Sequence, residues 1–500
     1  MFSLLGRTDM AEEKNAGDTD LPAFFIDLNL DQILDRVCEG WGDKVRKLYG
    51  FFPATKEDEE YRRAVYTDIK KDGVREALEL YYRSIRERFA YASRREAAVE
   101  RIQKHVWYLR EVNTYICSLG KLSEELDRQE PASEGMKGLL AYLKECISAE
   151  SFKNIKSVTA ELWKELASFR VVLTYEKERF TIAEGKGEGG YEAFLKESFP
   201  DVKRDYLSPF TDTEGYSSLE EEIVKLFRKK HRSFFKRLEA FCTEYPVYLN
   251  EGIAGIENEM LYYLAYAQFQ KKMSEKGFNM CTPKASKDKL TATALYDLAL
   301  ALTNMENGRE VVPNKVYLAE DEKFFVLTGP NQGGKTTYGR SLGQLVYLTK
   351  MGLDVPADSA SVPYYTNLWT HFSVEESAET GRGKLMDELV RLKPIMKDEQ
   401  KGAFVVINEL FTTAANFDAI EMGRRVLKYL TDRSCKGIYV THLGELSASC
   451  PGVVSLRAML DEDHVQTFRI ERSEAVEDTG INRQVLKYRL TYEQIKERFS

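Results

Sequence analysis

Hydrophobic residues in the first half of the chain recur at steps of three and four, the spacing of one face of an α-helix. The clearest series starts in a stretch, residues 74–119, that contains no Gly or Pro. It consists of Ile102, Val106, Leu109, Val112, Ile116, Leu119, Leu122 and Leu126. A second series is Leu219, Ile223, Leu226, Phe234, Leu238 and Phe241, and a third helix is predicted over residues 253–273. Such long helices need partners along their length, so they predict an elongated α-helical lever or, as the plainer alternative, a structural bundle.

One segment of this helical half has a different pattern. Residues 169–175 are rich in β-branched and aromatic side chains, and a second such run, residues 179–182, follows a charged turn. Four glycines, Gly185, Gly187, Gly189 and Gly190, come next. Two strand-like runs around a short turn predict a small hairpin near residues 169–190, inserted into the helical domain.

From about Thr291 onward, strand-like runs alternate with helical patterns. The runs include residues 323–328, 403–407 and 437–441. This alternation is typical of an α/β domain with a mostly parallel sheet covered by helices on both faces. The predicted organisation is a flexible tail (1–20), a helical domain (21–285), an α/β domain (286–475) and a C-terminal helical tail (476–500) with a last helix near residues 492–499.

Composition and charge narrow the class of protein. The 500 residues are 43% hydrophobic and 30% charged, and the net charge is −8. This balance argues against nonspecific coating of nucleic acid, although a local basic face remains compatible with it. No apolar run is long enough for a bilayer, and residues 1–20 lack the pattern of a signal peptide. The seven cysteines form no Cys-x-x-Cys pair or zinc spacing, which favours reduced thiols in the cytoplasm.

The strongest chemical signal is a glycine-rich loop at residues 329–336. Its sequence matches G-x-x-x-x-G-K-[ST], with an apolar run, residues 324–327, before it and a helical pattern, residues 338–349, after it. Glycines let backbone N–H groups surround a phosphate, and the following helix adds its positive end. The predicted ATP contacts are Gly329, Pro330, Asn331, Gln332, Gly333, Gly334, Lys335, Thr336 and Thr337. The Lys335 ammonium would bridge the β- and γ-phosphates, and the Thr336 hydroxyl would ligate Mg²⁺.

Two further strand ends carry candidate groups. The apolar run 403–407 ends in Asn408 and Glu409, and the run 437–441 is followed by His442. Glu409 would orient or deprotonate the attacking water. Asn408 stands where an Asp is usual, and its amide oxygen would accept from a magnesium-bound water without bringing charge. His442 would sense the γ-phosphate, although a single His is more often a structural hydrogen-bonding residue.

These residues together resemble the MutS family. The resemblance rests on the loop, residues 328–338, whose Gly-Pro-Asn start is distinctive, and on residues 351–357, which resemble a Gly-x-x-Val-Pro-Ala stretch. Val312-Pro313-Asn314 resembles the segment that lies against the adenine. Residues 381–388 lie where the family carries its trans-acting signature, and Asn408-Glu409 and Thr441-His442 resemble its magnesium/base pair and histidine switch. The motifs cover residues 291–472, and the preceding helices resemble the family's core and lever domain.

The resemblance implies a composite ATPase of the ABC type. Two protomers of a homodimer would pair so that the signature of one faces the nucleotide of the other. Lys335 and Thr336 would bind phosphate and Mg²⁺, Asn331 would lie toward the γ-phosphate, and Val312 and Asn314 would lie beside the adenine. Glu409 would be the base and His442 the switch, with Asn408 at the metal. The helices would carry ATP-dependent changes toward double-stranded or branched DNA held between the levers.

The chain departs from the family pattern in four places. Too little chain precedes the core for a mismatch-reading domain, the DNA clamp is reduced to the hairpin, and the C-terminal dimerisation helices are shortened or absent. The signature has Gly383-Lys384 where Ser-Thr is usual. We therefore hypothesise that Lys384 or Arg382 reaches across the dimer toward the γ-phosphate, as an arginine finger does.

Two basic stretches are candidates for DNA contact. The denser one is Arg228, Lys229, Lys230, His231 and Arg232 with Lys236 and Arg237, and the other is Arg83, Arg86, Arg88, Arg94 and Arg95. A solvated helix face is the plainer interpretation of each stretch, and contact with phosphates along a lever is the functional one.

The leading interpretation is a MutS-like, ATP-driven, dimeric DNA-binding protein of DNA repair or recombination. Its hydrolysis would be slow because Asn408 weakens the magnesium site, and Asn408→Asp should then accelerate it. The alternative from another class is a scaffold that uses ATP as a latch and binds a protein partner. An ATPase of the chromosome-organising kind fits less well, because sustained heptads are not evident.

Overall fold

The computed structural model describes residues 2–7, 22–53, 55–169, 227–372, 384–397, 401–463, 465–473 and 496, and the backbone of 171–176 and 179–184. Two compact units are present. Unit 1 comprises Met1–Glu76, Glu130–Leu139 and Glu251–Ser500, and unit 2 comprises Ala77–Gln129 and Leu140–Asn250. None of the helices in the described ranges is long and apolar enough to cross a membrane.

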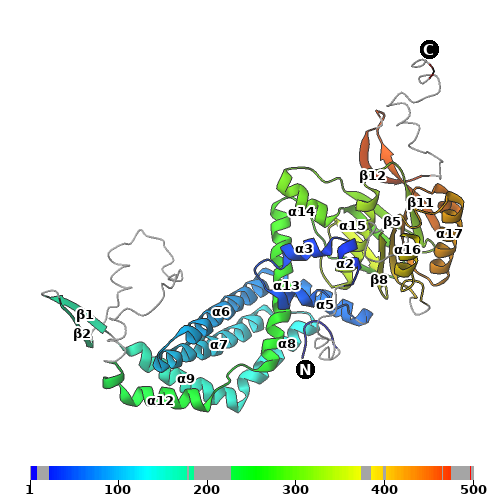
Figure 1. Cartoon of the computed structure of the whole chain (residues 1–500). Coiled ribbons are helices and arrows are strands. Elements are labelled where there is room, and N and C mark those ends of the chain that lie inside the picture. Colours follow the sequence, from blue (N-terminus) through cyan, green and yellow to red (C-terminus); the bar gives the residue numbers. More distant parts are fainter. Residues whose placement is uncertain are drawn as a thin grey trace. The chain divides into compact units, whose positions relative to one another are not determined.

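Unit 2 consists largely of long helices (Figure 1). They are α6 (Asp72–Ala97), α7 (Arg101–Gln129), α8 (Glu134–Ser148), α9 (Glu150–Ser168) and α12 (Arg232–Glu244), of which α6 and α8 begin in unit 1. Helix α7 contacts both α9 and α12. It buries Leu109, Val112, Ile116, Leu119, Leu122 and Leu126, so most of the predicted stripe is its core-facing side. The break between α6 and α7 carries no Gly or Pro and was not predicted.

The hairpin and the second stripe also belong to unit 2. Strands β1 (Val171–Glu176) and β2 (Arg179–Glu184) pair antiparallel, from Val171 opposite Glu184 to Glu176 opposite Arg179. Helix α12 buries the second half of the stripe, Phe234, Leu238 and Phe241. The first half of that stripe, in residues 219–226, lies outside the described residues, as does the last helix predicted near residues 492–499.

The main sheet of unit 1 has six strands in the order β12-β11-β6-β10-β9-β8. Their bounds are β6 (Phe324–Thr328), β8 (Leu368–Phe372), β9 (Phe404–Asn408), β10 (Lys436–Val440), β11 (Val453–Leu460) and β12 (Gln466–Arg472). The four pairings from β11 to β8 are parallel, and β11 pairs with β12 antiparallel. Strand β6, which precedes the glycine-rich loop, therefore lies inside the sheet with a parallel neighbour on each side.

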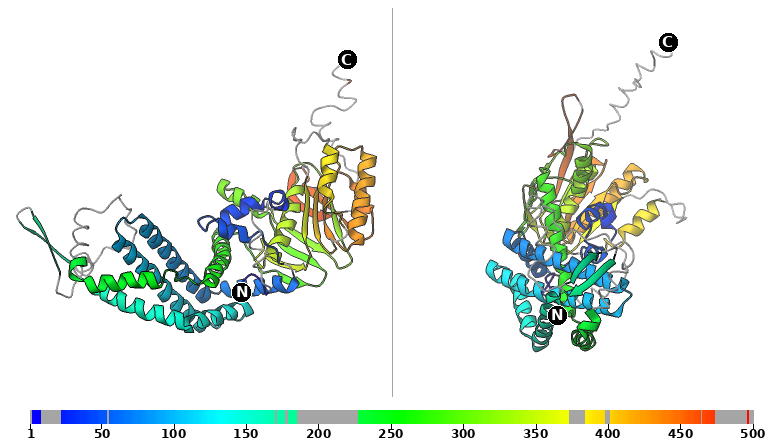
Figure 2. Two further views of the ribbon diagram at one scale, coloured as in Figure 1. Left: turned by 60° about the horizontal axis from the view of Figure 1, so that its bottom comes forward. Right: turned by 90° about the vertical axis from the view of Figure 1, so that its left-hand side faces the viewer.

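Helices cover both faces of this sheet (Figure 2). On one face, α15 (Lys335–Lys350) packs on β9 and β10, and a Cβ added at Gly339 of this helix would meet the side chains of Val440 and Val406. On the other, α16 (Lys384–Leu392) and α17 (Asn416–Asp432) enclose a core with Val405, Ile407 and Tyr439. Strand residues alternate between these two layers because successive side chains of a strand point to opposite faces.

A smaller sheet and several helices complete unit 1. The sheet has the order β3-β7-β4-β5 and is formed by β3 (Lys284–Ser286), β4 (Leu290–Leu295), β5 (Asn314–Leu318) and β7 (Ser359–Pro363). The helices are α2 (Phe24–Asp27), α3 (Leu30–Val37), α4 (Asp43–Leu48), α5 (Lys56–Ile69), α13 (Glu251–Glu275) and α14 (Leu298–Asn307), with a short 3-10 helix at Gly444–Ala448.

The border between the units differs from the predicted border at residue 285. The first 76 residues and α13 belong with the α/β part rather than with the lever-like helices. Helix α2 contacts β8, and the Tyr347 hydroxyl of α15 donates to the carbonyl of Tyr49 at 2.7 Å. Helical periodicity identifies a helix but not the surface that it covers, which explains the misplaced border.

The segment that follows α15 is fastened to α13. Tyr262 donates from its hydroxyl to the carbonyl of Met351 at 2.9 Å, and Tyr266 donates to the carbonyl of Asp354 at 2.6 Å. The Asp354 side chain, 2% exposed, accepts from Lys70, which caps the C-terminus of α5, at 2.8 Å and from Gln270 of α13 at 2.7 Å. The far end of the helix that begins in the glycine-rich loop is thus held by hydrogen bonds to α5 and α13.

The predicted flexible tail is partly wrong, because residues 2–7 form a buried N-terminal segment. Leu4 and Leu5 are fully buried. The backbone of this segment is bound by side chains of α5 and α13: Tyr61 donates to the Ser3 carbonyl, Tyr263 to the Leu4 carbonyl and Arg62 to the Leu5 carbonyl, and Glu259 accepts from the Leu4 N–H. Residues 8–21 lie outside the described residues. The sequence did not reveal this segment, because the acidic residues between 12 and 20 follow it closely and its partners are more than 50 residues away in sequence.

We predict that shortening a buried side chain of the N-terminal segment destabilises unit 1. Leu5→Ala should lower the free energy of unfolding by roughly 2–5 kcal/mol, because the cavity that it leaves is fully enclosed. Ile26→Ala is the matched control, since Ile26 is 73% exposed and its loss should change stability by less than about 0.5 kcal/mol. Calorimetric and urea unfolding of the whole chain would measure both, and equal midpoints for the two variants would show that residues 2–7 do not contribute to the core.

Candidate phosphate-loop site

The glycine-rich loop joins β6 to α15 and approaches β11 closely. A Cβ at Gly329, whose φ is +131°, would lie 2.9 Å from the Cβ of Ala458 and 3.0 Å from its backbone N. A Cβ at Gly333 would lie 3.0 Å from the carbonyl oxygen of Pro330. Gly334, with φ +85°, is the N-cap residue of α15. Glycine is therefore required at these positions by the backbone conformation and by close packing. A loop with these properties allows its backbone N–H groups to face a bound anion.

The lysine and threonine at the start of α15 have defined partners. The Lys335 ammonium donates to the carbonyls of Gly329 at 2.7 Å and Pro330 at 3.0 Å. Burial lowers the pKa of the Lys335 ammonium group, and the Glu409 carboxylate opposes that shift. The Thr336 hydroxyl donates to the amide oxygen of Asn408 at 3.0 Å. Two oxygen atoms of the kind that Mg²⁺ prefers thus lie together, one from the loop helix and one from the end of β9.

Glu409 and His442 also lie next to each other. Glu409 follows β9 with φ +54°, and its backbone N–H donates to the carbonyl of Val440 at 2.9 Å. The Glu409 carboxylate lies 3.1 Å from Nε2 of His442, and the two side chains are 31% and 46% exposed. Solvent can therefore reach this pair, which a carboxylate acting on a water molecule requires.

Asn314, which is predicted to lie beside the adenine together with Val312, makes hydrogen bonds that connect two strands. Asn314 donates from its amide to the carbonyl of Phe468 at 3.0 Å and more weakly to that of Val312 at 3.4 Å, and its amide oxygen accepts from the N–H of Ile470 at 2.8 Å. Its side chain thus joins β5 to β12. Strand β12 in turn reaches the glycine-rich loop, because Gln466 donates to the carbonyl of Asn331 at 2.9 Å.

Phe468 of β12 was not predicted from the sequence. A Cβ at Gly334 would lie 3.5 Å from its ring, the residue has φ +57°, and it is 47% exposed. Nothing in the pattern of the chain distinguishes this Phe from other strand residues, because its proximity to the loop depends on the pairing of β11 with β12. It belongs to the surroundings of the loop, together with Ala458.

The predicted trans-acting residues are only partly described. Arg382 and Gly383 lie outside the described residues, and Lys384 is the first residue of α16, with a side chain that is not described. The rest of α16 has an apolar exposed side formed by Leu385, Met386, Leu389 and Val390, which are 37–53% exposed.

The two basic stretches differ in their surroundings. In the first, Arg228, Lys229, Lys230, Arg232 and Lys236 are exposed, and Arg237 pairs with Glu165 of α9. In the second stretch, Arg83 and Arg86 are exposed, whereas the other three arginines have structural partners. Arg88 is 4% exposed and lies over the ring of Tyr115, Arg94 lies over Trp107, and Arg95 pairs with Glu111 at 2.9 Å. The sequence did not reveal the structural role of these three arginines, because their partners lie on the next helix, α7.

Within the described residues, no group of three or more His, Cys, Asp or Glu side chains could hold a metal ion. The oxygen pair from Thr336 and Asn408 is a metal-ligand candidate of another kind, one that suits an ion that keeps most of its water ligands. Fold and site together define an α/β protein with a glycine-rich phosphate-loop motif at the carboxyl edge of its sheet.

Comparison with known proteins agrees with this class. The family model of MutS domain V matches residues 325–487. DNA mismatch repair proteins MutS are similar to parts of the chain: that of Fervidobacterium nodosum is 29% identical over 149 residues, that of Solibacter usitatus is 31% identical over 188 residues, and that of Streptococcus pneumoniae serotype 19F is 24% identical over 298 residues. These matches cover 30%, 36% and 58% of this chain and 18%, 22% and 33% of the respective relatives.

Residues 325–487 therefore match MutS domain V, and the C-terminal half of the chain carries the similarity to MutS proteins. The chain spans a third or less of each of these relatives.

Proposed function

We propose that this protein binds and hydrolyses ATP with Mg²⁺ at the loop 329–336. The observation that carries the proposal is the meeting of five side chains at one edge of the sheet: Lys335, Thr336, Asn408, Glu409 and His442. Loop amides and Lys335 would hold the phosphates, and the oxygens of Thr336 and Asn408 would hold the metal. Mg²⁺ bound there would neutralise charge that develops on the phosphates.

Hydrolysis needs a group that orients water and accepts its proton. Glu409 is a carboxylate at the edge of the site, partly open to solvent, and His442 lies 3.1 Å from it. In the proposed reaction, the water oxygen forms a bond to the γ-phosphorus while its proton passes to Glu409 and the bond to the ADP oxygen breaks. His442 holds the Glu409 carboxylate in place and would respond to the loss of the γ-phosphate. Asn408 brings no negative charge to the metal, so the turnover would be slow.

The exposed apolar side of α16 suggests how two copies would pair. Leu385, Met386, Leu389 and Val390 lie on the helix that follows residues 381–383, and an apolar helix face of this kind is stabilised when a partner covers it. We propose that it packs against a second copy in the ATP-bound state. Lys384 or Arg382 would then lie at the partner's nucleotide, which supplies a positive charge where the signature lacks Ser-Thr.

The exposed cations before and within α12 suggest contact with nucleic acid. Arg228, Lys229, Arg232 and Lys236 are exposed and lie within nine residues in unit 2, and the buried side of α12 carries Phe234, Leu238 and Phe241. We propose that they contact the phosphates of double-stranded or branched DNA, in a role related to DNA repair or recombination. A scaffold that binds a protein partner is the alternative, and the acidic balance of the chain favours it.

Removing the proposed base should abolish hydrolysis without abolishing ATP binding. Glu409→Gln should lower steady-state phosphate release by about 100-fold or more, because the amide cannot accept the proton. Glu445→Gln, the same change at an exposed position three residues after His442, is the control and should leave the rate unchanged. Phosphate release and binding of a fluorescent ATP analogue would be measured for each variant. Hydrolysis that persists in Glu409→Gln would remove Glu409 from the mechanism.

A charge on the apolar side of α16 should prevent pairing of two copies. Leu389→Asp should reduce the ATP-dependent dimer, because the carboxylate would be buried in the interface without a partner. Leu300→Asp on α14 is the control, since Leu300 is 37% exposed and Leu389 is 41% exposed. Light scattering with and without Mg-ATP would distinguish the 57.5 kDa chain from its dimer. An undiminished dimer in Leu389→Asp would place the interface elsewhere.

Reversing charge before α12 should weaken binding to duplex DNA. Lys229→Glu with Arg232→Glu should lower the affinity and should make the salt dependence shallower by about two counterions. The control is Lys153→Glu with Lys156→Glu, two exposed cations on α9. Fluorescence anisotropy over a range of salt concentrations would compare duplex and branched DNA. If the wild-type chain binds neither DNA at low salt, the scaffold alternative becomes the better account.

A further inference from the structure

The turn that follows Glu409 has an unusual backbone. Glu409 has φ +54° and Phe411 has φ +65°, so two residues with side chains occupy the left-handed region that favours Gly. Such a conformation persists only where surrounding contacts hold it. Because this turn carries the proposed base, the contacts that hold it also determine where the Glu409 carboxylate lies.

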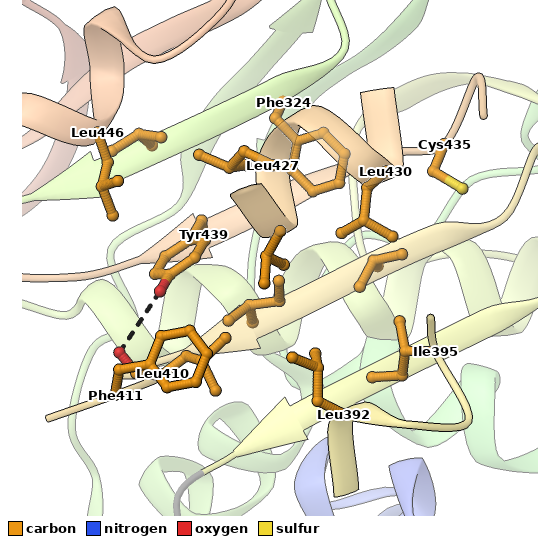
Figure 3. Packing of buried hydrophobic residues seen from close by; sticks show 14 of the residues in the cluster. Phe324, Leu392, Ile395, Leu410, Phe411, Leu427, Leu430, Cys435, Tyr439 and Leu446 are labelled. Carbon is orange, nitrogen blue, oxygen red and sulfur yellow. Dashed lines mark hydrogen bonds between the residues drawn. The ribbon is translucent and has the colours of Figure 1, made fainter. Parts of the chain in front are cut away.

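Side chains from two elements hold the turn. Tyr439 of β10 donates from its hydroxyl to the carbonyl of Leu410 at 3.4 Å, as Figure 3 shows. Glu388 of α16 accepts from the backbone N–H of Phe411 at 3.1 Å. Leu410 and Phe411 are each 2% exposed, and their side chains pack in the same core as Leu392 of α16 (Figure 3). The N–H of Phe411 is therefore a buried donor, and a carboxylate is a strong acceptor for it.

Glu388 is itself held in place. The residue is 3% exposed, and Nε2 of His371 on β8 lies 3.1 Å from its backbone carbonyl. One turn further along α16, Arg391 donates to the carbonyl of Phe372 at 2.7 Å and pairs with Asp27 at 3.2 Å. Helix α16 is thus anchored to β8 and α2, and one of its buried side chains reaches the turn at Glu409.

We propose that Glu388 is a positioning residue for Glu409. Its carboxylate holds residues 409–411 in the left-handed turn that directs Glu409 toward His442. Because Glu388 lies on α16, a shift of this helix reaches Glu409 through Glu388. This inference rests on the proposed role of Glu409 as the base, and it adds a route by which contacts at the start of α16 set the rate of hydrolysis.

The proposal separates hydrolysis from ATP binding. Lys335 and Thr336 are the first two residues of α15, and their hydrogen bonds run to Gly329, Pro330 and Asn408. A change at Glu388 should therefore alter the position of Glu409 while it leaves the phosphate-binding groups in place. A purely structural role for Glu388 would instead lower stability and ATP affinity together.

Two substitutions at Glu388 test the proposal. Glu388→Met removes the acceptor for the Phe411 N–H and should lower the single-turnover hydrolysis rate between about ten-fold and 100-fold, as small misplacements of a catalytic group do. Glu388→Gln keeps an oxygen acceptor but loses the charge, so its rate should lie between wild type and Glu388→Met. The dissociation constant of a fluorescent ATP analogue should change by less than about two-fold in both variants, because Glu388 is not among the proposed phosphate-binding groups.

The matched controls are Glu259→Gln and Glu259→Met. Glu259 is a carboxylate on α13, 2% exposed, that accepts from a backbone N–H of the N-terminal segment. These controls report the effect of losing a buried carboxylate far from the turn, and they should leave the rate near wild type below their melting temperatures. Where Glu388→Met does not fold, Glu388→Gln decides the question by itself.

The outcomes are distinct. A rate reduced in the order wild type, Glu388→Gln, Glu388→Met, with unchanged ATP affinity, supports the positioning role. An unchanged rate in the Glu388 variants, an equal loss in the Glu259 controls, or a parallel loss of ATP affinity overturns it. Glu409→Gln is measured beside them: if it still hydrolyses ATP, the proposed function fails, whereas inactive Glu409→Gln with fully active Glu388 variants overturns this inference alone.

Discussion

The parallel register of β6, β10 and β9 is the constraint on which the site depends. Leu327 of β6 lies opposite Val440 of β10, and Val440 lies opposite Asn408 of β9. The loop at Gly329, the residue pair Thr441-His442 and the residue Glu409 therefore leave the sheet in one layer. A slip of one residue in any of these pairings would turn the alternating side chains to the opposite face and separate the proposed base from the loop.

Packing against this sheet gives the site its shape. Strand β11 approaches Gly329 so closely that a side chain there would collide with Ala458, and β12 contributes Gln466 and Phe468 beside the loop. On the opposite face of the sheet from α15, helix α16 reaches the turn after β9 through Glu388. The site is thus surrounded by elements from both the start and the end of the α/β part, and its groups share hydrogen bonds with distant segments of the chain.

Unit 1 also depends on a segment that looks unimportant in the sequence. The N-terminal segment and helices α3, α4 and α5 contact α13, and α13 is in turn bonded to the segment that follows α15. The glycine-rich loop lies at one end of α15 and these bonds lie at the other. This arrangement gives changes at the loop a continuous path of packed backbone and side chains to α13, which is the first helix of unit 1 after unit 2.

The sequence by itself identified the candidate groups of the site. The loop 329–336, the Asn408-Glu409 pair and His442 are local patterns whose residue types follow from phosphate, metal and water chemistry, and the three- and four-residue spacing of α7 follows from helix geometry. Only the tertiary structure determined which residues contact each other. Asn314 joins β5 to β12, and the Glu388 carboxylate accepts from the N–H of Phe411. Arg88 is buried over the ring of Tyr115, and residues 2–7 form a buried segment. The pattern of neighbouring residues determines helices, strands and loop motifs locally. These contacts join residues that are distant in sequence, and such residues meet only when the hydrophobic faces of the chain are buried against each other.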